Sequence, residues 1–352
     1  MSIESSILEL GKKAKKASLE MKLCNNDQKN AALSNLIKSI EKNKDKILEA
    51  NSIDLDNGKK KSLSKPLINR LTLTNKSIDS LIKSIQDIIT IPDPIGLTLE
   101  EWDRPNGLKF RKVSTPLGVL GVIYESRPNV TVDASCLSIK SGNSIILRGG
   151  SDSFYSSKEL VKNITQSFNA AGLPNFCVQM IDTPDREAVE YLLKLKDYVD
   201  VIIPRGGKGL IEKINSSSKI PVIKHLDGIC HVYVDKEADI KIAKRVVFNS
   251  KMRRPEICGA AETLLIDESI KDQAMKILNP LKEVKCEIRG DNFIQSLDSD
   301  FKIAKEKDWS LEYLDKILSV KIVSGVEEAI NHINNYSSGH TESIITNNDE
   351  TF

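Results

Sequence analysis

The chain has 352 residues, of which 40% are hydrophobic and 28% charged, a composition typical of a globular protein long enough for about two domains. Its 51 basic and 49 acidic residues give a net charge of +2, so neither nucleic acid nor a membrane surface is expected as a partner. Six cysteines are scattered without the spacing of a zinc site or a disulfide framework. We therefore expect no metal site and a reducing, cytoplasmic location.

Residues 1 to about 92 are predicted to be helical, because apolar residues recur at helical spacing along a lysine-rich stretch. Three such apolar stripes begin at Ile7, Ala31 and Ile78. The many lysines are more typical of a solvated face than of a binding patch. The segment Ile91-Pro92-Asp93-Pro94 should end the helices, since proline disfavours helical geometry at the preceding residue.

A β-hairpin arm is predicted next, at about residues 96–115. Leu97–Asp103 and Leu108–Val113 flank Arg104-Pro105-Asn106-Gly107, and Asn-Gly is a strong signal for a type I′ turn. Because both strands are polar at many positions, we expect the hairpin to lie outside the core. It could pair with another subunit or be a plain surface hairpin, and its sequence favours neither reading.

From Pro116 onward, short apolar runs alternate with helical patterns, which is typical of parallel sheets covered by helices on both faces. We therefore predict an α/β fold with domains at residues 1–235 and 236–352. The predicted strands lie at 119–124, 144–147, 177–181, 199–203, 221–223, 231–234, 262–266, 284–289, 320–323 and 343–345. The predicted helices between them lie at 156–171, 185–195, 209–215, 238–254, 270–278 and 326–334.

Cys258 lies in the predicted loop between the helix at 238–254 and the strand at 262–266. Loops held between rigid elements often carry catalytic groups. Arg253 and Arg254 are close in the sequence, and neighbouring cations lower the pKa of a thiol and so favour the nucleophilic thiolate. Cys258 is thus a candidate nucleophile. The alternative is a small core cysteine that packs as an apolar residue.

Two basic, glycine-rich segments follow predicted strands. Pro204-Arg205-Gly206-Gly207-Lys208-Gly209 precedes a helix, whose backbone N–H groups could bind a phosphate, although it matches neither GxGxxG nor a Walker A loop. Arg148-Gly149-Gly150 follows the strand at 144–147. Ligands of α/β sheets bind at the carboxyl ends of strands, so the two segments together predict a dinucleotide or phosphorylated ligand. Tight turns with a solvated lysine are the alternative.

The segment YESRPNV at residues 124–130 also follows a buried strand. Arg127 could bind a carboxylate or phosphate, and Asn129 could donate a hydrogen bond to an oxyanion. The alternative for both is capping of the next helix. His231 alternates with strand residues and is expected to be structural, whereas the loop residue His340 fits either role.

Six segments, taken in order, closely resemble the γ-glutamyl phosphate reductase (glutamate-5-semialdehyde dehydrogenase) family of the aldehyde dehydrogenase superfamily. They contain, in order, VIYESRPNVTVDA, LRGG, VIIPRGGKGLI, the HxDGxCHxYVD pattern at 225–235, RPxxC at 254–258 with ETLLI, and YxSGHTxxI at 336–344. The match covers almost the whole chain, from the N-terminal helices to Thr346, and the six segments in order are far more specific than any one of them.

The resemblance implies a Rossmann-like nucleotide-binding domain, an α/β catalytic domain and an oligomerisation arm that contains the hairpin. It implies reduction of L-glutamyl 5-phosphate by NADPH to L-glutamate 5-semialdehyde in proline biosynthesis, through a thioester on Cys258. It also implies a homo-oligomer and contact with the kinase that makes the substrate. The implied site residues are Asn129 as oxyanion donor, Arg148, Gly206, Gly207, Lys208 and Gly209 for the cofactor, and Arg127, Arg254 and His340 for the substrate.

The sequence also differs from its superfamily at particular positions. Oxidising members carry a glutamate base in an ELGGK-like motif, where this chain has Lys224-His225-Leu226-Asp227-Gly228, so a thioester should persist until it is reduced. Family members usually have Asn and Gln where this chain has Gly259 and Arg253, and they continue beyond Phe352, which predicts a shortened catalytic domain. The remaining alternatives are another acyl reductase of the superfamily and an inactive nucleotide-binding relic.

Overall fold

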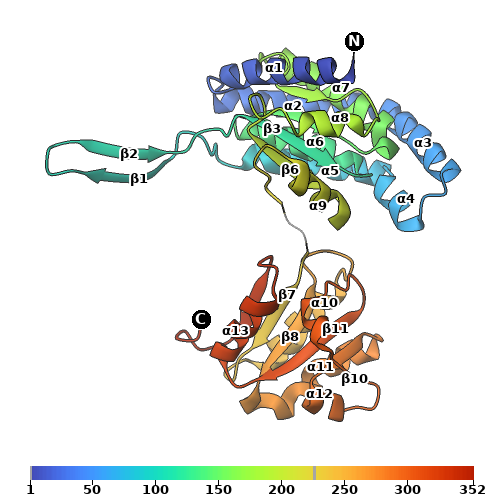
Figure 1. The fold of residues 1–352 in the computed structure, drawn as a ribbon, viewed down its shortest axis with the longest axis vertical. Helices are drawn as coiled ribbons and strands as arrows, with labels where there is room; N and C mark the ends of the chain where they lie inside the picture. The colour runs from blue at the N-terminus through green and yellow to red at the C-terminus, as the bar shows by residue number, and fades with distance from the viewer. Residues whose placement is uncertain (1, 225–226) are drawn as a thin grey trace. The chain divides into compact units, whose positions relative to one another are not determined.

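The structure, a computed structural model, describes residues 2–224 and 227–352, and it divides into two compact units, Met1–Lys224 and His225–Phe352 (Figure 1). The predicted α/β class with parallel sheets is confirmed. The division comes earlier than the predicted boundary at residue 235. The reason is that β7 (Cys230–Val234), which we assigned to the first domain, pairs with β8 (Ala261–Asp267) and β12 (Glu342–Ile345) of the second unit.

The first unit begins with the predicted run of helices. They are α1 (Ile3–Met21), α2 (Asn26–Lys42), α3 (Lys44–Lys60), α4 (Lys65–Leu71) and α5 (Asn75–Thr90). The three apolar stripes are buried, as their helical spacing predicted. One lysine departs from the predicted solvated face. Lys29 is buried, and its Nζ lies 2.6 Å from Asp93 Oδ2 and 3.3 Å from the carbonyl of Lys140.

A parallel sheet follows, with the strand order β5-β4-β3-β6. Its members are β3 (Val119–Tyr124), β4 (Ser144–Arg148), β5 (Val178–Met180) and β6 (Val201–Arg205). In chain order this is 3-2-1-4, the arrangement of a nucleotide-binding doubly wound sheet, whose topological switch point lies between β3 and β6. The strand predicted at 221–223 is reduced to one bridge between Ile202 and Val222.

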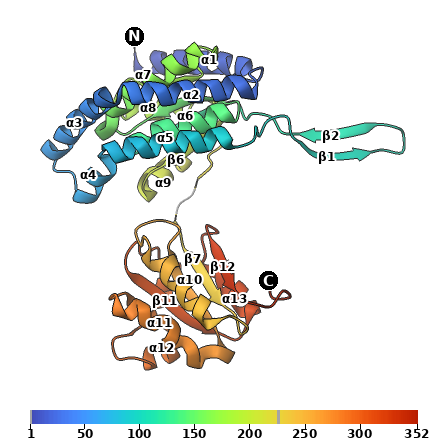
Figure 2. The same cartoon turned by 180° about the vertical axis from the view of Figure 1, so that it is seen from behind.

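Helices cover both faces of this sheet, which explains its continuous apolar runs (Figure 2). Along β3, Leu120 and Val122 face the core shared with α2, α5, α6 (Pro128–Lys140) and α7 (Phe154–Ala170). Val119 and Ile123 face the opposite core, which includes residues of α1, α8 (Glu187–Leu192) and α9 (Lys208–Ser217). The alternation follows from the two-residue period of a strand.

The predicted hairpin is formed by β1 (Thr98–Asp103) and β2 (Lys109–Val113), and it is exposed along its whole length (Figure 1). Its turn is not type I′, because Gly107 has a positive φ of 85° whereas Asn106 does not. Proline lacks the N–H that would close a two-residue loop, so Arg104 pairs with Leu108 around a three-residue loop instead. Trp102 and Phe110 stack across the strands with ring centroids 5.5 Å apart.

The second unit contains a parallel sheet with the order β10-β9-β11-β8-β7-β12. The strands not yet given are β9 (Glu287–Gly290), β10 (Lys302–Ile303) and β11 (Ile317–Val323). Residues of α10 (Ile240–Met252) and α11 (Ala274–Glu283) share the core of one face, and Ala329 of α13 (Val326–Tyr336) belongs to the core of the other. Two short elements, β10 and α12 (Asn292–Ser296), were not predicted. No helix within the described ranges has both the length and the apolar character needed to cross a bilayer.

Candidate active site

Cys258 lies in the loop between α10 and β8, as predicted, at the amino edge of the second sheet. Three other segments that precede strands lie at the same edge because all strands of the sheet run parallel. Gly228 precedes β7, Glu312 precedes β11 and His340 precedes β12. The candidate nucleophile therefore lies opposite the carboxyl edge, where ligands of open α/β sheets usually bind.

The backbone of Cys258 is closely packed, although its side chain is only half-buried. A Cβ atom at Gly228 would lie 1.8 Å from the carbonyl oxygen of Cys258, so only glycine fits there. The Cys230 thiol donates a hydrogen bond of 3.2 Å to the same oxygen. The loop thus holds the backbone of Cys258 while leaving the thiol partly accessible.

The alternative reading of Cys258, a small cysteine packed in the core, fits other cysteines of the chain instead. Burial raises the pKa of Cys177 to about 12, and it raises those of Cys230 and Cys286 to about 11. These thiols are therefore neutral near pH 7 and poor nucleophiles. Cys258 is not buried in this way, which favours the reading of a candidate nucleophile.

Arg253 and Arg254 are both exposed, and Arg253 lies at the carboxyl-terminal cap of α10. Arg254 Nε lies 3.3 Å from the carboxylate of Glu256, which offsets part of the positive charge near the loop. Activation of the Cys258 thiol by these two cations therefore stays a prediction.

His340 lies beside the Cys258 loop. Its Nδ1 is 2.7 Å from the hydroxyl of Thr341 and 3.7 Å from the thiol of Cys230. A Cβ atom at Gly259 would lie 3.9 Å from the imidazole, at ordinary van der Waals distance, so the loop has room for a side chain there. In contrast, His231 is buried within β7, as expected of a structural residue.

The predicted ligand-binding segments of the first unit lie together at the carboxyl edge of its sheet. Residues 125–129 follow β3, residues 149–150 follow β4 and residues 206–209 follow β6, and these three strands are neighbours. The Glu125 N–H donates to the carbonyl of Arg205 at 3.1 Å, which joins two of the segments. The arrangement coincides with the switch point between β3 and β6.

Glu125, which the sequence reasoning did not single out, lies against the glycine-rich loop. Its Oε2 accepts a 2.9 Å hydrogen bond from the N–H of Gly207, the N-cap residue of α9. A Cβ atom at Gly206 would lie 2.6 Å from this carboxylate, whereas one at Gly209 would meet nothing within 4 Å. One predicted phosphate-binding N–H is therefore held by a carboxylate of the same chain. In the sequence, the feature that could have predicted this contact is an acidic residue directly after the buried strand Val119–Tyr124.

Arg148 is buried, and its guanidinium binds backbone carbonyls. Nη1 donates to Gly149 at 2.5 Å, and Nη2 donates to Pro184 and Asp185 at 3.0 and 3.1 Å. Burial lowers the pKa of Arg148 from its ordinary value, with Arg186 adding to this effect. Arg148 thus fixes the segment at 184–185, and its role toward a cofactor stays a prediction.

The capping alternative for Arg127 and Asn129 is wrong. Arg127 occupies the N-cap position of α6, but its side chain makes no capping hydrogen bond. Asn129 lies inside the first turn, and its Nδ2 donates to Asp133 Oδ2 at 3.2 Å. Burial raises the pKa of Asp133, which also accepts a hydrogen bond from Ser84.

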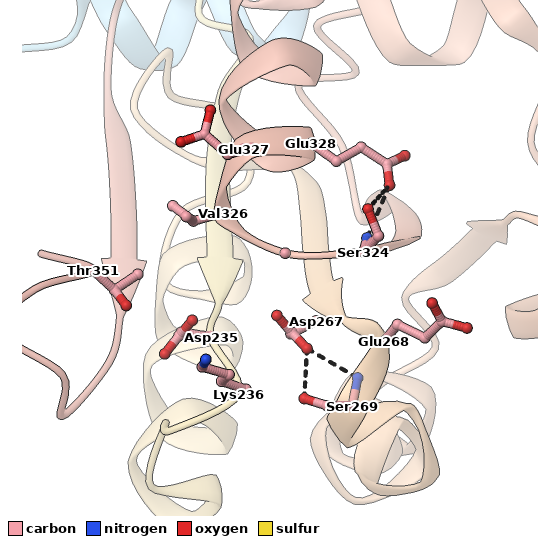
Figure 3. Close-up of a pocket in the computed structure, with 11 residues that line it drawn as sticks. Asp235, Lys236, Asp267, Glu268, Ser269, Ser324, Val326, Glu327, Glu328 and Thr351 are labelled. Atoms are coloured by element: carbon pink, nitrogen blue, oxygen red, sulfur yellow. Dashed lines mark hydrogen bonds between the residues drawn. The ribbon is translucent and has the colours of Figure 1, made fainter.

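A cavity of about 610 Å³ lies at the carboxyl edge of the second sheet (Figure 3). It is lined by segments that follow β7, β8 and β11, and its carboxylates have local partners, such as Ser269 for Asp267 and Ser324 for Glu328. None of the predicted site residues lines it. The cavity is therefore separate from the Cys258 loop at the opposite edge. Of the HxDGxCHxYVD and Lys224–Gly228 stretches, His225 and Leu226 lie outside the described residues.

Residues 4–291 match the aldehyde dehydrogenase family, and the chain belongs to this family. The parallel sheets and the half-buried cysteine at the amino edge of the second sheet agree with this match. The chain is 48% identical to gamma-glutamyl phosphate reductase of Bartonella tribocorum over 96% of its own length and 82% of that protein's length. It is 47% identical to gamma-glutamyl phosphate reductase of Brucella suis, over 99% and 83% of the two chains.

Solved structures agree with this relationship. The crystal structure of gamma-glutamyl phosphate reductase from Thermotoga maritima has a TM-score of 0.92 and 39% identity, with 98% of this chain and 84% of that chain covered. The protein of the same name from Saccharomyces cerevisiae has a TM-score of 0.59 and 32% identity, with 97% and 87% covered. The resemblance inferred from the sequence motifs is thereby confirmed.

Proposed function

We propose that this chain reduces L-glutamyl 5-phosphate to L-glutamate 5-semialdehyde and phosphate with NADPH, a step of proline biosynthesis. The observation that supports this most is the half-buried Cys258, whose backbone packs closely against Gly228. It occurs in a chain 48% identical to a protein named gamma-glutamyl phosphate reductase.

In the proposed reaction, the Cys258 thiolate attacks the acyl carbon of the acyl phosphate. The carbon–oxygen bond to phosphate then breaks, phosphate leaves with the electron pair, and a thioester remains on Cys258. The bound nicotinamide cofactor supplies the hydride that reduces this thioester. Departure of the Cys258 thiolate releases the aldehyde.

Hydrogen-bond donors and cations of the chain would bind the charged groups of the substrate. We propose Asn129 as the oxyanion donor, because one of its two amide hydrogens remains after the bond to Asp133. Arg127, Arg254 and His340 are proposed to bind the substrate's carboxylate and phosphate groups. The position of His340 beside the Cys258 loop supports its part in this proposal.

The glycine-rich loop fits a cofactor phosphate in its local geometry. The positions of Gly207 and Gly209 leave open space, since a Cβ at Gly207 would meet only Glu125, at 3.8 Å. Backbone N–H groups at the N-terminus of α9 favour an anion there, with Lys208 adding positive charge. A phosphate at the Gly207 N–H requires the Glu125 carboxylate to move away. The preference for NADPH rests on the family resemblance.

The proposed thioester should be slow to hydrolyse. Three carboxylates near the Cys258 loop are already engaged: Glu312 by the Gly228 N–H at 2.9 Å, Glu262 by Lys251 at 2.6 Å and Glu256 by Arg254 at 3.3 Å. A carboxylate held in this way is a poor general base for water. The chain therefore favours reduction over hydrolysis.

We also propose that the hairpin joins copies of the chain in a homo-oligomer. Its apolar side chains are unusually exposed, with Leu99 at 60%, Trp102 at 40% and Phe110 at 39%. Exposed apolar surface on paired strands is typical of an interface. Contact with the kinase that makes the substrate stays a prediction.

The proposed activity is tested with Cys258→Ser. We expect NADPH-dependent reduction to fall by on the order of 10³-fold or more, as for the loss of a nucleophile elsewhere, while cofactor binding is kept. Cys24→Ser is the matched control, because Cys24 is also half-buried but lies in the first unit. Wild-type turnover by Cys258→Ser would refute the proposed function.

A further inference from the structure

A buried ion pair closes the base of the loop that carries Cys258. Lys251 lies in the last turn of α10 and Glu262 near the start of β8, so the two residues flank the loop. Lys251 Nζ and Glu262 Oε2 are 2.6 Å apart, and the two side chains are only 0% and 1% exposed. The pair therefore connects the helix before the nucleophile to the strand after it.

Stability alone does not account for this pair. Removing two charges from water carries a large desolvation penalty, and apolar residues of similar volume often give equal or greater stability. Burial raises the pKa of Glu262 to about 7, although the ammonium of Lys251 opposes the rise. Because the ion pair is costly and flanks the loop of the candidate nucleophile, we consider a role in holding that loop in place.

Glu262 also connects the loop to a second segment. Its Oε1 accepts a 3.3 Å hydrogen bond from the N–H of Leu314, in the segment before β11. From the same segment, Glu312 Oε1 accepts the N–H of Gly228, the residue that packs directly on the Cys258 carbonyl. The ion pair and the support of Cys258 thus belong to one continuous set of contacts.

We propose that Lys251 and Glu262 are positioning residues that hold Cys258 in its reactive place, an inference that rests on the proposed function. The pair fixes both ends of the loop, and the segment of Glu312 and Leu314 transmits this order to Gly228. Misplacement of a reacting group by about 1 Å can cost about 10²-fold in rate. Substrate binding outside the loop should depend little on the pair.

The test replaces both charges with groups of similar size, as Lys251→Met/Glu262→Gln. Glutamine keeps an acceptor for the Leu314 N–H, so the double variant removes the ionic link alone. We expect kcat to fall by about 10- to 100-fold, while the KM for the acyl phosphate and the KM for NADPH stay within about two-fold of wild type. Amide hydrogen exchange should become faster in the loop at residues 253–260 and stay unchanged in the strands of the second unit.

Glu328→Gln is the matched control. It removes another carboxylate that binds a lysine, at the carboxyl edge of the same sheet, where Lys321 Nζ lies 2.9 Å away. This variant should lose stability without a change in kcat. It separates a general loss of stability from a local effect on the Cys258 loop.

The proposal is overturned if the folded double variant keeps kcat within about two-fold of wild type, or if exchange in residues 253–260 does not rise. If the double variant does not fold, Lys251→Met alone applies the same test, because a neutral Glu262 can keep its bond to Leu314. Misfolding of both variants would assign the pair to global stability and overturn the proposal. Activity of Cys258→Ser would instead refute the proposed function, and the exchange measurement on the loop would still stand.

Discussion

A methyl group at Gly228 should displace the nucleophile. In Gly228→Ala the new Cβ would lie 1.8 Å from the Cys258 oxygen, 2.6 Å from its carbonyl carbon and 2.8 Å from its Cα. Cβ contacts under 3.0 Å are essentially never seen, so the two backbones must separate by at least about 1.2 Å, the difference between 3.0 and 1.8 Å. A shift of this size at a reacting group can cost about 10²-fold in kcat, and overpacking costs about 1–3 kcal/mol of stability.

The assay compares kcat, KM and the thermal midpoint of wild type, Gly228→Ala and Gly259→Ala. The control adds the same methyl group one residue after Cys258, where the nearest heavy atom is 3.9 Å away in His340. We expect a large loss of kcat in Gly228→Ala only. A folded Gly228→Ala protein with wild-type kcat would refute the reasoning that this contact positions Cys258.

Three further predictions test other parts of the molecule. Burial, with His231 and Lys321, lowers the pKa of His332 to about 4 from 6.5, so the unfolded chain binds a proton at a higher pH than the folded one. The free energy of unfolding should fall by up to about 3 kcal/mol between pH 6.5 and 4, and urea titrations should show a weaker fall in His332→Phe. Gly207→Val should weaken cofactor binding by about ten-fold or more, and unchanged affinity of the folded variant in fluorescence titration would count against the loop. Trp102→Glu in the exposed hairpin should lower the oligomer mass in light scattering, whereas an unchanged mass would show that the hairpin is a plain surface feature.

Local patterns predicted much of the secondary structure. The apolar run Val119–Tyr124 is β3 with the same bounds, and Pro255 ended the predicted helix close to the end of α10 at Met252. The loop position of Cys258 followed from the same reasoning. These features depend on hydrophobic periodicity and on the backbone limits of proline, which act within a few residues.

Features set by distant partners could not be predicted in this way. The assignment of β7 to the second unit depends on its pairing with β8 and β12, and the sequence does not specify strand partners. The contact of Gly228 with Cys258 and the burial of Lys29 against Asp93 depend on the same long-range arrangement. The bond from Gly207 to Glu125 joins residues that follow different strands.

The prediction of a type I′ turn in the hairpin was wrong for a local reason. Asn106-Gly107 alone favours type I′, but the preceding Pro105 has no N–H to close the loop. The neighbouring residue therefore decided the turn, and weighing it would have corrected the prediction from sequence.

The most direct test of the central claim is whether Cys258 becomes acylated. Incubation with L-glutamyl 5-phosphate without cofactor, followed by acid quench and peptide mass analysis, should show one glutamyl group on the peptide containing Cys258. Phosphate should be released in equal amount, and Cys258→Ser should show neither. Cofactor-dependent reduction by a wild-type protein that forms no adduct at Cys258, or that is acylated at another residue, would contradict the account.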